Sequence, residues 1–215
     1  MSVASSTVLL ETVRVRDGSV PLWPYHRARL ERSCFEVGIL SPPRMEVPVG
    51  EDDLVCRFEI SRDGVRCSSR PAGPAHPVRI VTARTVHEPY PHKTTARDCF
   101  DRAAEEATVA GAGEAILLTP EGAVAEGTSF AILWWEMNLL CAPPLRLGIL
   151  PSVGRARVKD LAHWIQEKRV RRRELAGRPV LLVNAVRGIV EVASWDGHPV
   201  PRHPQTARLV EAFWP

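Results

Sequence analysis

Alternating and helical hydrophobic patterns predict a small α+β unit in the first part of the chain. Residues 8–16 alternate well enough for a strand, and an Asp17-Gly18 turn and an extended stretch at 20–23 follow. Residues 25–37 read as a helix that Gly38 stops. The remaining expected elements are a Ser-Pro-Pro loop at 41–43, a hairpin of strands 54–60 and 65–69 around Arg62-Asp63-Gly64, and a strand at 78–86.

The rest of the chain reads as a second, larger lobe. Residues 87–92, rich in proline and aromatic rings, are predicted to connect the lobes, which we place at 1–88 and 89–215. We expect Thr94 and Thr95 to cap a helix that runs to about Ala110. Further expected strands are 115–118, 123–126, 129–134, 139–141, 180–183 and 189–192, with a loop at 143–151 and a helix near Gly154. Residues 164–176 fit a strand and a short helix, or one long helix.

Composition excludes several classes of protein. Apolar residues make up 45% and charged residues 25% of the chain, as in ordinary globular proteins. No apolar run approaches the roughly 20 residues of a membrane span. The N-terminus lacks a basic stretch before its apolar residues, and the five cysteines are odd in number and scattered, so we expect a cytoplasmic protein without disulfides or a metal site. The basic cluster at 168–173 lacks interleaved aromatic residues, so we expect a solvated surface and no nucleic-acid partner.

Lys93 is the candidate for chemistry. The chain has 28 basic side chains, of which only residues 93, 159 and 168 are lysine. Arginine keeps its proton in proteins, whereas a desolvated lysine can lose it and condense with a carbonyl. A lysine at a helix start is commonly a solvated surface residue, so the residues elsewhere in the chain must decide between the two interpretations.

An aldehyde cofactor on Lys93, such as pyridoxal phosphate, would need a carboxylate at its ring nitrogen and a site for its phosphate. Glu126 is a carboxylate in an otherwise apolar strand, although an exposed hairpin glutamate is the alternative. Val153 and Gly154 open a predicted helix, whose N-terminal N–H groups can bind phosphate. Arg29 is a candidate phosphate ligand or a surface arginine.

Five motifs resemble, in the family's order, the class IV aminotransferase-type (fold type IV) pyridoxal phosphate enzymes. They are Leu10-Glu11-Thr12-Val13-Arg14-Val15 with His26-Arg27-Ala28-Arg29-Leu30, Pro91-His92-Lys93-Thr94-Thr95-Ala96-Arg97, residues 122–128, residues 144–154, and Asn184-Ala185-Val186-Arg187-Gly188. The resemblance covers about residues 8–192. Within the family the chain most resembles 4-amino-4-deoxychorismate lyases, especially the lyase-like domain fused to aminodeoxychorismate synthase, through its His-Lys-Thr-Thr and Asn-x-x-Arg-Gly runs.

The resemblance implies a two-lobe α+β fold and a role for each motif. Lys93 would be the Schiff-base lysine and proton carrier, and Glu126 the partner of the ring nitrogen. The phosphate ligands would be Arg29, the backbone of Val153 and Gly154, and the Asn184-Ala185 turn. Arg187, and more weakly Arg14, would anchor substrate carboxylates. The chain departs from the family at Ala131, where an asparagine is usual, and at Asp98, where some members have tyrosine.

The expected function is a lyase that converts 4-amino-4-deoxychorismate to 4-aminobenzoate and pyruvate. Two alternatives stay open: an aminotransferase acting on a small amino acid, and a non-catalytic descendant of the fold. Family members are commonly homodimers, so a homodimer is expected here too. Trp134, Trp135 and Met137 would suit an apolar interface, or else lie buried within the sheet.

Overall fold

The computed structural model describes residues 7–39, 45–47 and 53–215, so the loop expected at 41–43 lies outside the described residues. The chain divides into two compact units. The first comprises residues 1–73, 92–96 and 215, and the second comprises 74–91 and 97–214. The lobes expected from the sequence divide at residues 88–89, whereas these units divide after Gly73 and assign Lys93 to the first unit.

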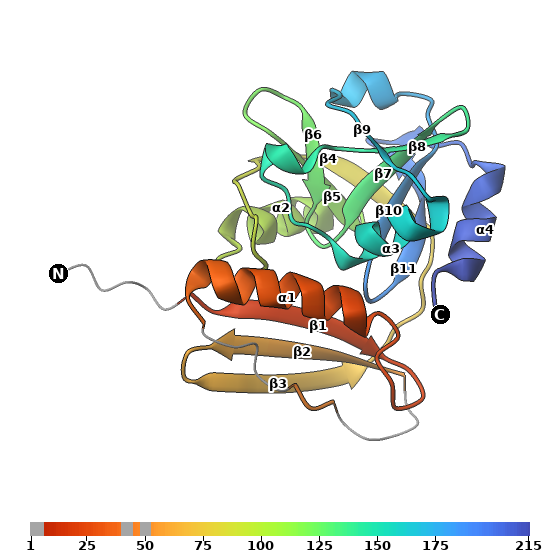
Figure 1. The fold of residues 1–215 in the computed structure, drawn as a ribbon. Helices are drawn as coiled ribbons and strands as arrows, with labels where there is room; N and C mark the ends of the chain where they lie inside the picture. The colour runs from red at the N-terminus through yellow and green to blue at the C-terminus, as the bar shows by residue number, and fades with distance from the viewer. Residues whose placement is uncertain (1–6, 40–44, 48–52) are drawn as a thin grey trace. The chain divides into compact units, whose positions relative to one another are not determined.

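The first unit is a three-stranded antiparallel sheet packed against one helix (Figure 1). The strands β1 (Leu9–Val15), β2 (Leu54–Ser61) and β3 (Gly64–Pro71) lie in the order β1-β2-β3. Alternate residues of β1 and β2 face the helix α1 (Trp23–Val37) and form its apolar core with Leu30 and Cys34. The strand, hairpin and helix expected here are therefore present.

Both ends of α1 follow from local chemistry. The helix begins at Trp23, so the extended stretch expected at 20–23 is wrong at its end. Pro24 lies in the first turn, where its missing N–H and its fixed φ favour helix initiation. At the other end Gly38 has a φ of 73°, and Ile39 N donates to Cys34 O at 2.8 Å. A glycine is favoured there because side chains resist a left-handed conformation.

The second unit is built on a nine-stranded mixed sheet. Its path runs β6-β5-β4-β11-β10-β7-β8-β9, with β12 paired to β11. The strands are β4 (Val78–Val86), β5 (Glu114–Leu118), β6 (Val124–Gly127), β7 (Ala131–Glu136), β8 (Leu139–Ala142), β9 (Gln166–Glu167), β10 (Val180–Asn184), β11 (Gly188–Trp195) and β12 (His198–Pro199). The pairs β4–β5, β4–β11 and β8–β9 are parallel, and the others are antiparallel. The fold is α+β, as expected.

Three α-helices pack on this sheet: α2 (Asp98–Val109) contacts β4 and β5, α3 (Val153–Ala162) contacts β10, and α4 (Pro204–Ala212) contacts β11. Two 3-10 helices lie at Leu145–Leu147 and Arg172–Leu175. With β9, the second resolves the ambiguity at 164–176 in favour of a strand and a short helix. The helix α4 was not predicted. None of the described helices is long and apolar enough to cross a membrane.

The core of the second unit contains Trp134 and Trp135, for which the sequence did not decide between an interface and the interior of the sheet. Trp134 is fully buried and Trp135 is 4% exposed, so both lie within the sheet packing of their own chain. Trp135 Nε1 also donates to Thr206 Oγ1 at 2.9 Å. Met137, at 86% exposed, is the only one of the three expected interface residues that lies on the surface.

Candidate functional site

Lys93 is held by backbone pairing to β1. Leu10 N donates to Lys93 O at 2.7 Å, Thr94 forms an isolated bridge with Leu9, and Thr95 N donates to Val8 O at 3.1 Å. The expectation that Thr94 and Thr95 cap a helix is wrong. The helix α2 begins four residues later than Thr94, and its N-cap, Arg97, makes no side-chain capping bond. Pairing with the sheet edge satisfies these backbone groups and so competes with the helix.

The side chains of Glu11, His26 and Arg29 form a buried polar group in the first unit, with the Glu11 carboxylate at its centre. Arg29 Nε donates to Glu11 Oε1 at 2.8 Å, and Arg29 Nη2 donates to Oε2 at 2.6 Å. His26 Nδ1 lies 2.7 Å from Oε2. Arg29, the expected phosphate ligand, is therefore fixed in place, and its Nη1 is the nitrogen that makes no hydrogen bond to the described residues. The Glu11 and His26 contacts were not predicted.

The charges in this group favour an ionised Glu11 and a neutral His26. Burial raises the pKa of Glu11, but the Arg29 charge and the hydrogen bonds from His26 and Arg29 lower it from 4.5 to about 2 overall. Burial lowers the pKa of His26, and the charges of Arg29 and Lys93 lower it further, against the effect of Glu11. A neutral ring that donates from Nδ1 leaves an acceptor at Nε2, which is buried without a partner among the described residues.

The Glu11 group makes a prediction about acid stability. A carboxylate with a lowered pKa stabilises the fold above its unfolded pKa near 4.5, and that stabilisation is lost as the pH falls toward about 2. We expect the contribution of Glu11 to the free energy of unfolding to fall by about 3 kcal/mol between pH 5 and pH 2. Urea unfolding of the wild type and Glu11→Gln at stepped pH measures it. The difference between the two proteins should shrink as the pH falls, and a constant difference would contradict this interpretation.

Glu126 lies in β6 of the second unit, where it is 5% exposed. Its Oε1 is bound at 2.9 Å by His87 Nε2 and at 3.0 Å by the backbone N–H of Leu150. Oε2 accepts no hydrogen bond from the described residues. The exposed-hairpin alternative for Glu126 is thus excluded. The arrangement leaves one carboxylate oxygen available for an N–H donor such as a protonated heterocycle.

The two expected phosphate-binding segments of the second unit are in contact. Ser152 caps α3 by accepting from Arg155 N at 3.3 Å. A Cβ atom added to Gly154 would lie 2.8 Å from Val183 Cγ2 and 2.9 Å from the backbone of Asn184. Only a glycine permits this approach of the α3 N-terminus to the end of β10. The N-terminus of α3, whose first backbone N–H groups can bind an anion, therefore lies against the end of β10 at Asn184.

We expect Gly154→Ala to weaken anion binding through this contact. A methyl group would push against the backbone of Asn184, which cannot rotate away as a flexible side chain can. The expected cost is about 1–3 kcal/mol of unfolding free energy, with roughly tenfold weaker binding of inorganic phosphate. Thermal unfolding and phosphate titration measure the two effects. Gly73→Ala is the control, because an added Cβ there would meet no atom within 4 Å.

The turn from Asn184 to Gly188 joins β10 to β11 and carries two more expected site residues. Asn184 Oδ1 accepts from Val186 N at 3.0 Å and from Arg187 N at 2.7 Å, which fixes the turn. Ala185 is buried, and Arg187 is exposed, with its guanidinium carbon 5.9 Å from the centre of the Phe130 ring. Arg187 is thus available to a carboxylate ligand.

Arg14 has a carboxylate partner in its own unit. Its Nε donates to Asp53 Oδ1 at 2.7 Å, and Nη2 contacts Oδ2 of the same carboxylate. A substrate carboxylate would have to compete with Asp53, which makes Arg14 a weaker candidate than Arg187. Arg14, Arg29 and Lys93 belong to the first unit, and Glu126, Gly154, Asn184 and Arg187 belong to the second.

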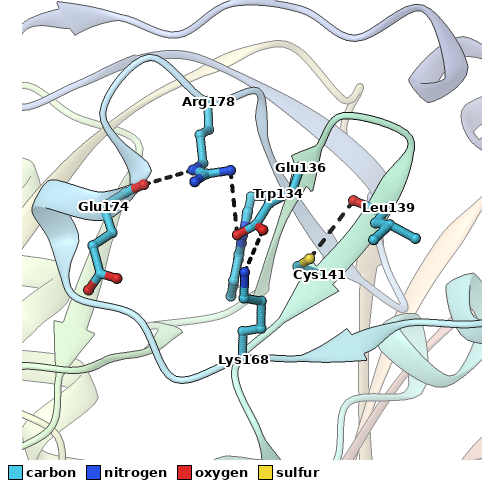
Figure 2. Close-up of polar contacts among 7 residues, drawn as sticks. All are labelled: Trp134, Glu136, Leu139, Cys141, Lys168, Glu174 and Arg178. Atoms are coloured by element: carbon cyan, nitrogen blue, oxygen red, sulfur yellow. Dashed lines mark hydrogen bonds and ion pairs between the residues drawn. The ribbon is translucent and has the colours of Figure 1, made fainter.

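The other two lysines, Lys159 and Lys168, lie at or near the surface of the second unit. Lys168 Nζ lies 2.5 Å from Glu136 Oε2, and Arg178 Nη1 lies 3.5 Å from Oε1 of the same carboxylate (Figure 2). Trp134 Nε1 also donates to Glu136 Oε1, at 3.0 Å. Lys159 is exposed in the last turns of α3. Lys168 is thus engaged in an ion pair with Glu136, and Lys159 lies on the exposed side of α3.

Comparison with known proteins identifies the family. Residues 65–195, more than half of the chain, match the family model described as amino-transferase class IV. The chain belongs to the class IV aminotransferase family. A sequence comparison with curated proteins found no match to this chain.

Solved structures share the class IV fold along nearly the whole chain. A candidate 4-amino-4-deoxychorismate lyase from Legionella pneumophila is 22% identical with a TM-score of 0.82, over 96% of this chain and 90% of its own. A branched-chain aminotransferase from Thermoproteus uzoniensis, with norvaline, is 25% identical with a TM-score of 0.82, over 97% and 84%. A hypothetical aminotransferase from Mycobacterium tuberculosis, in a PLP-bound form, is 21% identical with a TM-score of 0.82, over 99% and 90%.

Proposed function

We propose that this class IV protein is a pyridoxal phosphate-dependent lyase that converts 4-amino-4-deoxychorismate to 4-aminobenzoate and pyruvate. The observation that carries the pyridoxal phosphate chemistry is the Glu126 carboxylate, which is buried and bonded on Oε1 while Oε2 is left for a ring nitrogen. The His-Lys-Thr-Thr and Asn-x-x-Arg-Gly runs support the lyase branch. So do two candidate 4-amino-4-deoxychorismate lyases among the similar structures, at 22% and 24% identity.

Each unit carries residues that suit a part of the cofactor. In the second unit, the first backbone N–H groups of α3, at Val153 and Gly154, have no partner within the helix and can bind a phosphate. In the first unit, Arg29 Nη1 makes no hydrogen bond to the described residues and can bind an anion. When bound, the cofactor supplies an electron-withdrawing ring that stabilises negative charge at the carbon bearing the substrate nitrogen.

The proposed roles divide between proton transfer and positioning. Lys93 would hold the cofactor, and its free amine would remove the proton from the substrate carbon that bears the nitrogen. Glu126 Oε2 would accept a hydrogen bond from the ring nitrogen and would keep that nitrogen protonated. Arg187 pairs with a substrate carboxylate, for which its bidentate guanidinium is suited. Elimination breaks the C–O bond between the ring and the enolpyruvyl group, the ring becomes aromatic, and the departing enolpyruvate takes up a proton to give pyruvate.

Product analysis tests this proposal. Purified protein loaded with pyridoxal phosphate is incubated with 4-amino-4-deoxychorismate, and 4-aminobenzoate and pyruvate are quantified. We expect the two products in equal amounts without any added amine acceptor. Turnover that appears only when 2-oxoglutarate is present, with glutamate as a product, would contradict the lyase assignment.

An aminotransferase acting on a small amino acid is the second candidate. The 25% identity to the Thermoproteus uzoniensis branched-chain aminotransferase favours it. Incubation with branched-chain amino acids and 2-oxoglutarate distinguishes the two reactions, since only an aminotransferase returns the amine to an acceptor. A non-catalytic descendant would turn over neither substrate. We further propose that the protein is a homodimer and acts in the cytoplasm. Size-exclusion chromatography with light scattering measures its oligomeric state.

A further inference from the structure

His87 is a buried histidine that the proposed roles do not yet use. It directly follows β4 and is 3% exposed, and its backbone N–H donates to Leu118 O at 2.8 Å. Its ring stands edge-on to Phe100, with centroids 6.0 Å apart and an interplanar angle of 83°. The backbone bond and the aromatic contact fix the ring, so His87 Nε2 is held at 2.9 Å from Glu126 Oε1.

The surroundings of His87 decide which ring nitrogen carries the proton. Glu126 Oε1 already accepts from Leu150 N and, as a carboxylate oxygen, can only accept from His87 Nε2. Nδ1 has no hydrogen-bond partner among the described residues, and His87 also lines a cavity of about 450 Å³. The other polar groups of this cavity are Thr119, Glu121, Arg146 and Arg169, and the last three are exposed. The ring therefore joins the buried carboxylate to a polar, solvent-reaching cavity.

We propose that His87 is a positioning residue that holds the Glu126 carboxylate through Oε1, leaves Oε2 for the cofactor, and thereby keeps the proton on the ring nitrogen of the bound cofactor. The inference rests on the proposed function, because Glu126 must face that nitrogen. Hydrogen bonds to a carboxylate stabilise its charged form. The donors on Oε1 thus favour a charged pair of protonated ring and carboxylate over a neutral pair in which Glu126 holds the proton.

Removing the His87 donor should therefore move the proton from the ring toward Glu126. His87→Phe keeps an aromatic ring beside Phe100 and removes the N–H, whereas His87→Gln can keep an N–H donor near the position of Nε2. The protein is loaded with pyridoxal phosphate that is ¹⁵N-labelled in the ring, and the ¹⁵N chemical shift is measured by NMR. The wild type and His87→Gln should show a protonated ring nitrogen, and His87→Phe should shift toward the unprotonated form.

Kinetics give a second readout. We expect kcat of His87→Phe to fall about tenfold with little change in KM, because one hydrogen bond to a charged group is lost from a step after binding. His87→Gln should recover most of this loss. His198→Gln is the control, since His198 is exposed in β12 and is not among the residues hydrogen-bonded to Glu126.

The outcomes separate this inference from the proposed function. A His87→Phe protein whose ring nitrogen stays protonated and whose kcat is unchanged would overturn the role of His87 alone. Failure of the wild type to form any adduct with the cofactor would overturn the proposed function and this inference with it. If His87→Phe does not fold, the tautomer of His87 in ¹⁵N-histidine-labelled wild type decides. A proton on Nε2 supports the inference, and a proton on Nδ1 alone contradicts it.

Discussion

Lys93→Ala is expected to abolish the covalent attachment of pyridoxal phosphate and to lower lyase activity by about 10³-fold or more, because one amine serves as both attachment point and base. The absorbance band of the imine between the lysine and the cofactor should disappear. Absorbance spectra of the loaded proteins and the rate of 4-aminobenzoate formation measure both effects.

The other lysines provide matched controls. Lys168→Ala removes an ammonium that is paired with Glu136, and Lys159→Ala removes an exposed one, so both variants should keep the band and the activity. Lys93→Arg keeps the positive charge but cannot form an imine, and it should be as inactive as Lys93→Ala. A Lys93→Ala protein that retains the band would show that another amine holds the cofactor.

Glu126→Gln is expected to lower kcat by roughly 10²–10³-fold while leaving the cofactor covalently attached. The amide oxygen can still accept from His87 Nε2 and Leu150 N, which turns the amide NH₂ toward the ring nitrogen. A donor at that place favours an unprotonated ring, which withdraws electrons less well. Single-turnover kinetics measure the proton-abstraction step directly.

A nearby glutamate separates this effect from a general loss of charge. Glu121 lies in the turn between β5 and β6, is exposed, and pairs with Arg169 at 3.3 Å. Glu121→Gln should leave kcat within about twofold of the wild type, because solvent screens such pairs. Equal kcat values for Glu126→Gln and the wild type would remove Glu126 from the mechanism.

Much of the fold was predictable because its elements carry local signals. The strand at 78–86, the hairpin around Arg62-Asp63-Gly64 and the helix that ends at Gly38 all rest on periodicity and turn residues within a few positions of one another. The fold class was also correct. The helix expected at Thr94 was wrong because that segment pairs with β1, and tertiary contacts of this kind override local propensity.

The supporting residues of the candidate site could not be predicted in the same way. His87 and Glu126 are 39 positions apart, and nothing in the run at 87–92, which resembled a connecting segment, indicates that a carboxylate lies 2.9 Å from its first side chain. The contact of Gly154 with Asn184 also joins residues that are far apart in the sequence, so local patterns do not predict it. The motifs marked both segments for phosphate, but only the packing of α3 on β10 requires glycine there.

A crystal structure of the protein loaded with pyridoxal phosphate tests the central claim most directly. We predict continuous density from Lys93 Nζ to the cofactor, Glu126 Oε2 within hydrogen-bonding distance of its ring nitrogen, and its phosphate at the N-terminus of α3. A cofactor attached to Lys159 or Lys168, or a ring nitrogen that faces away from Glu126, would contradict it.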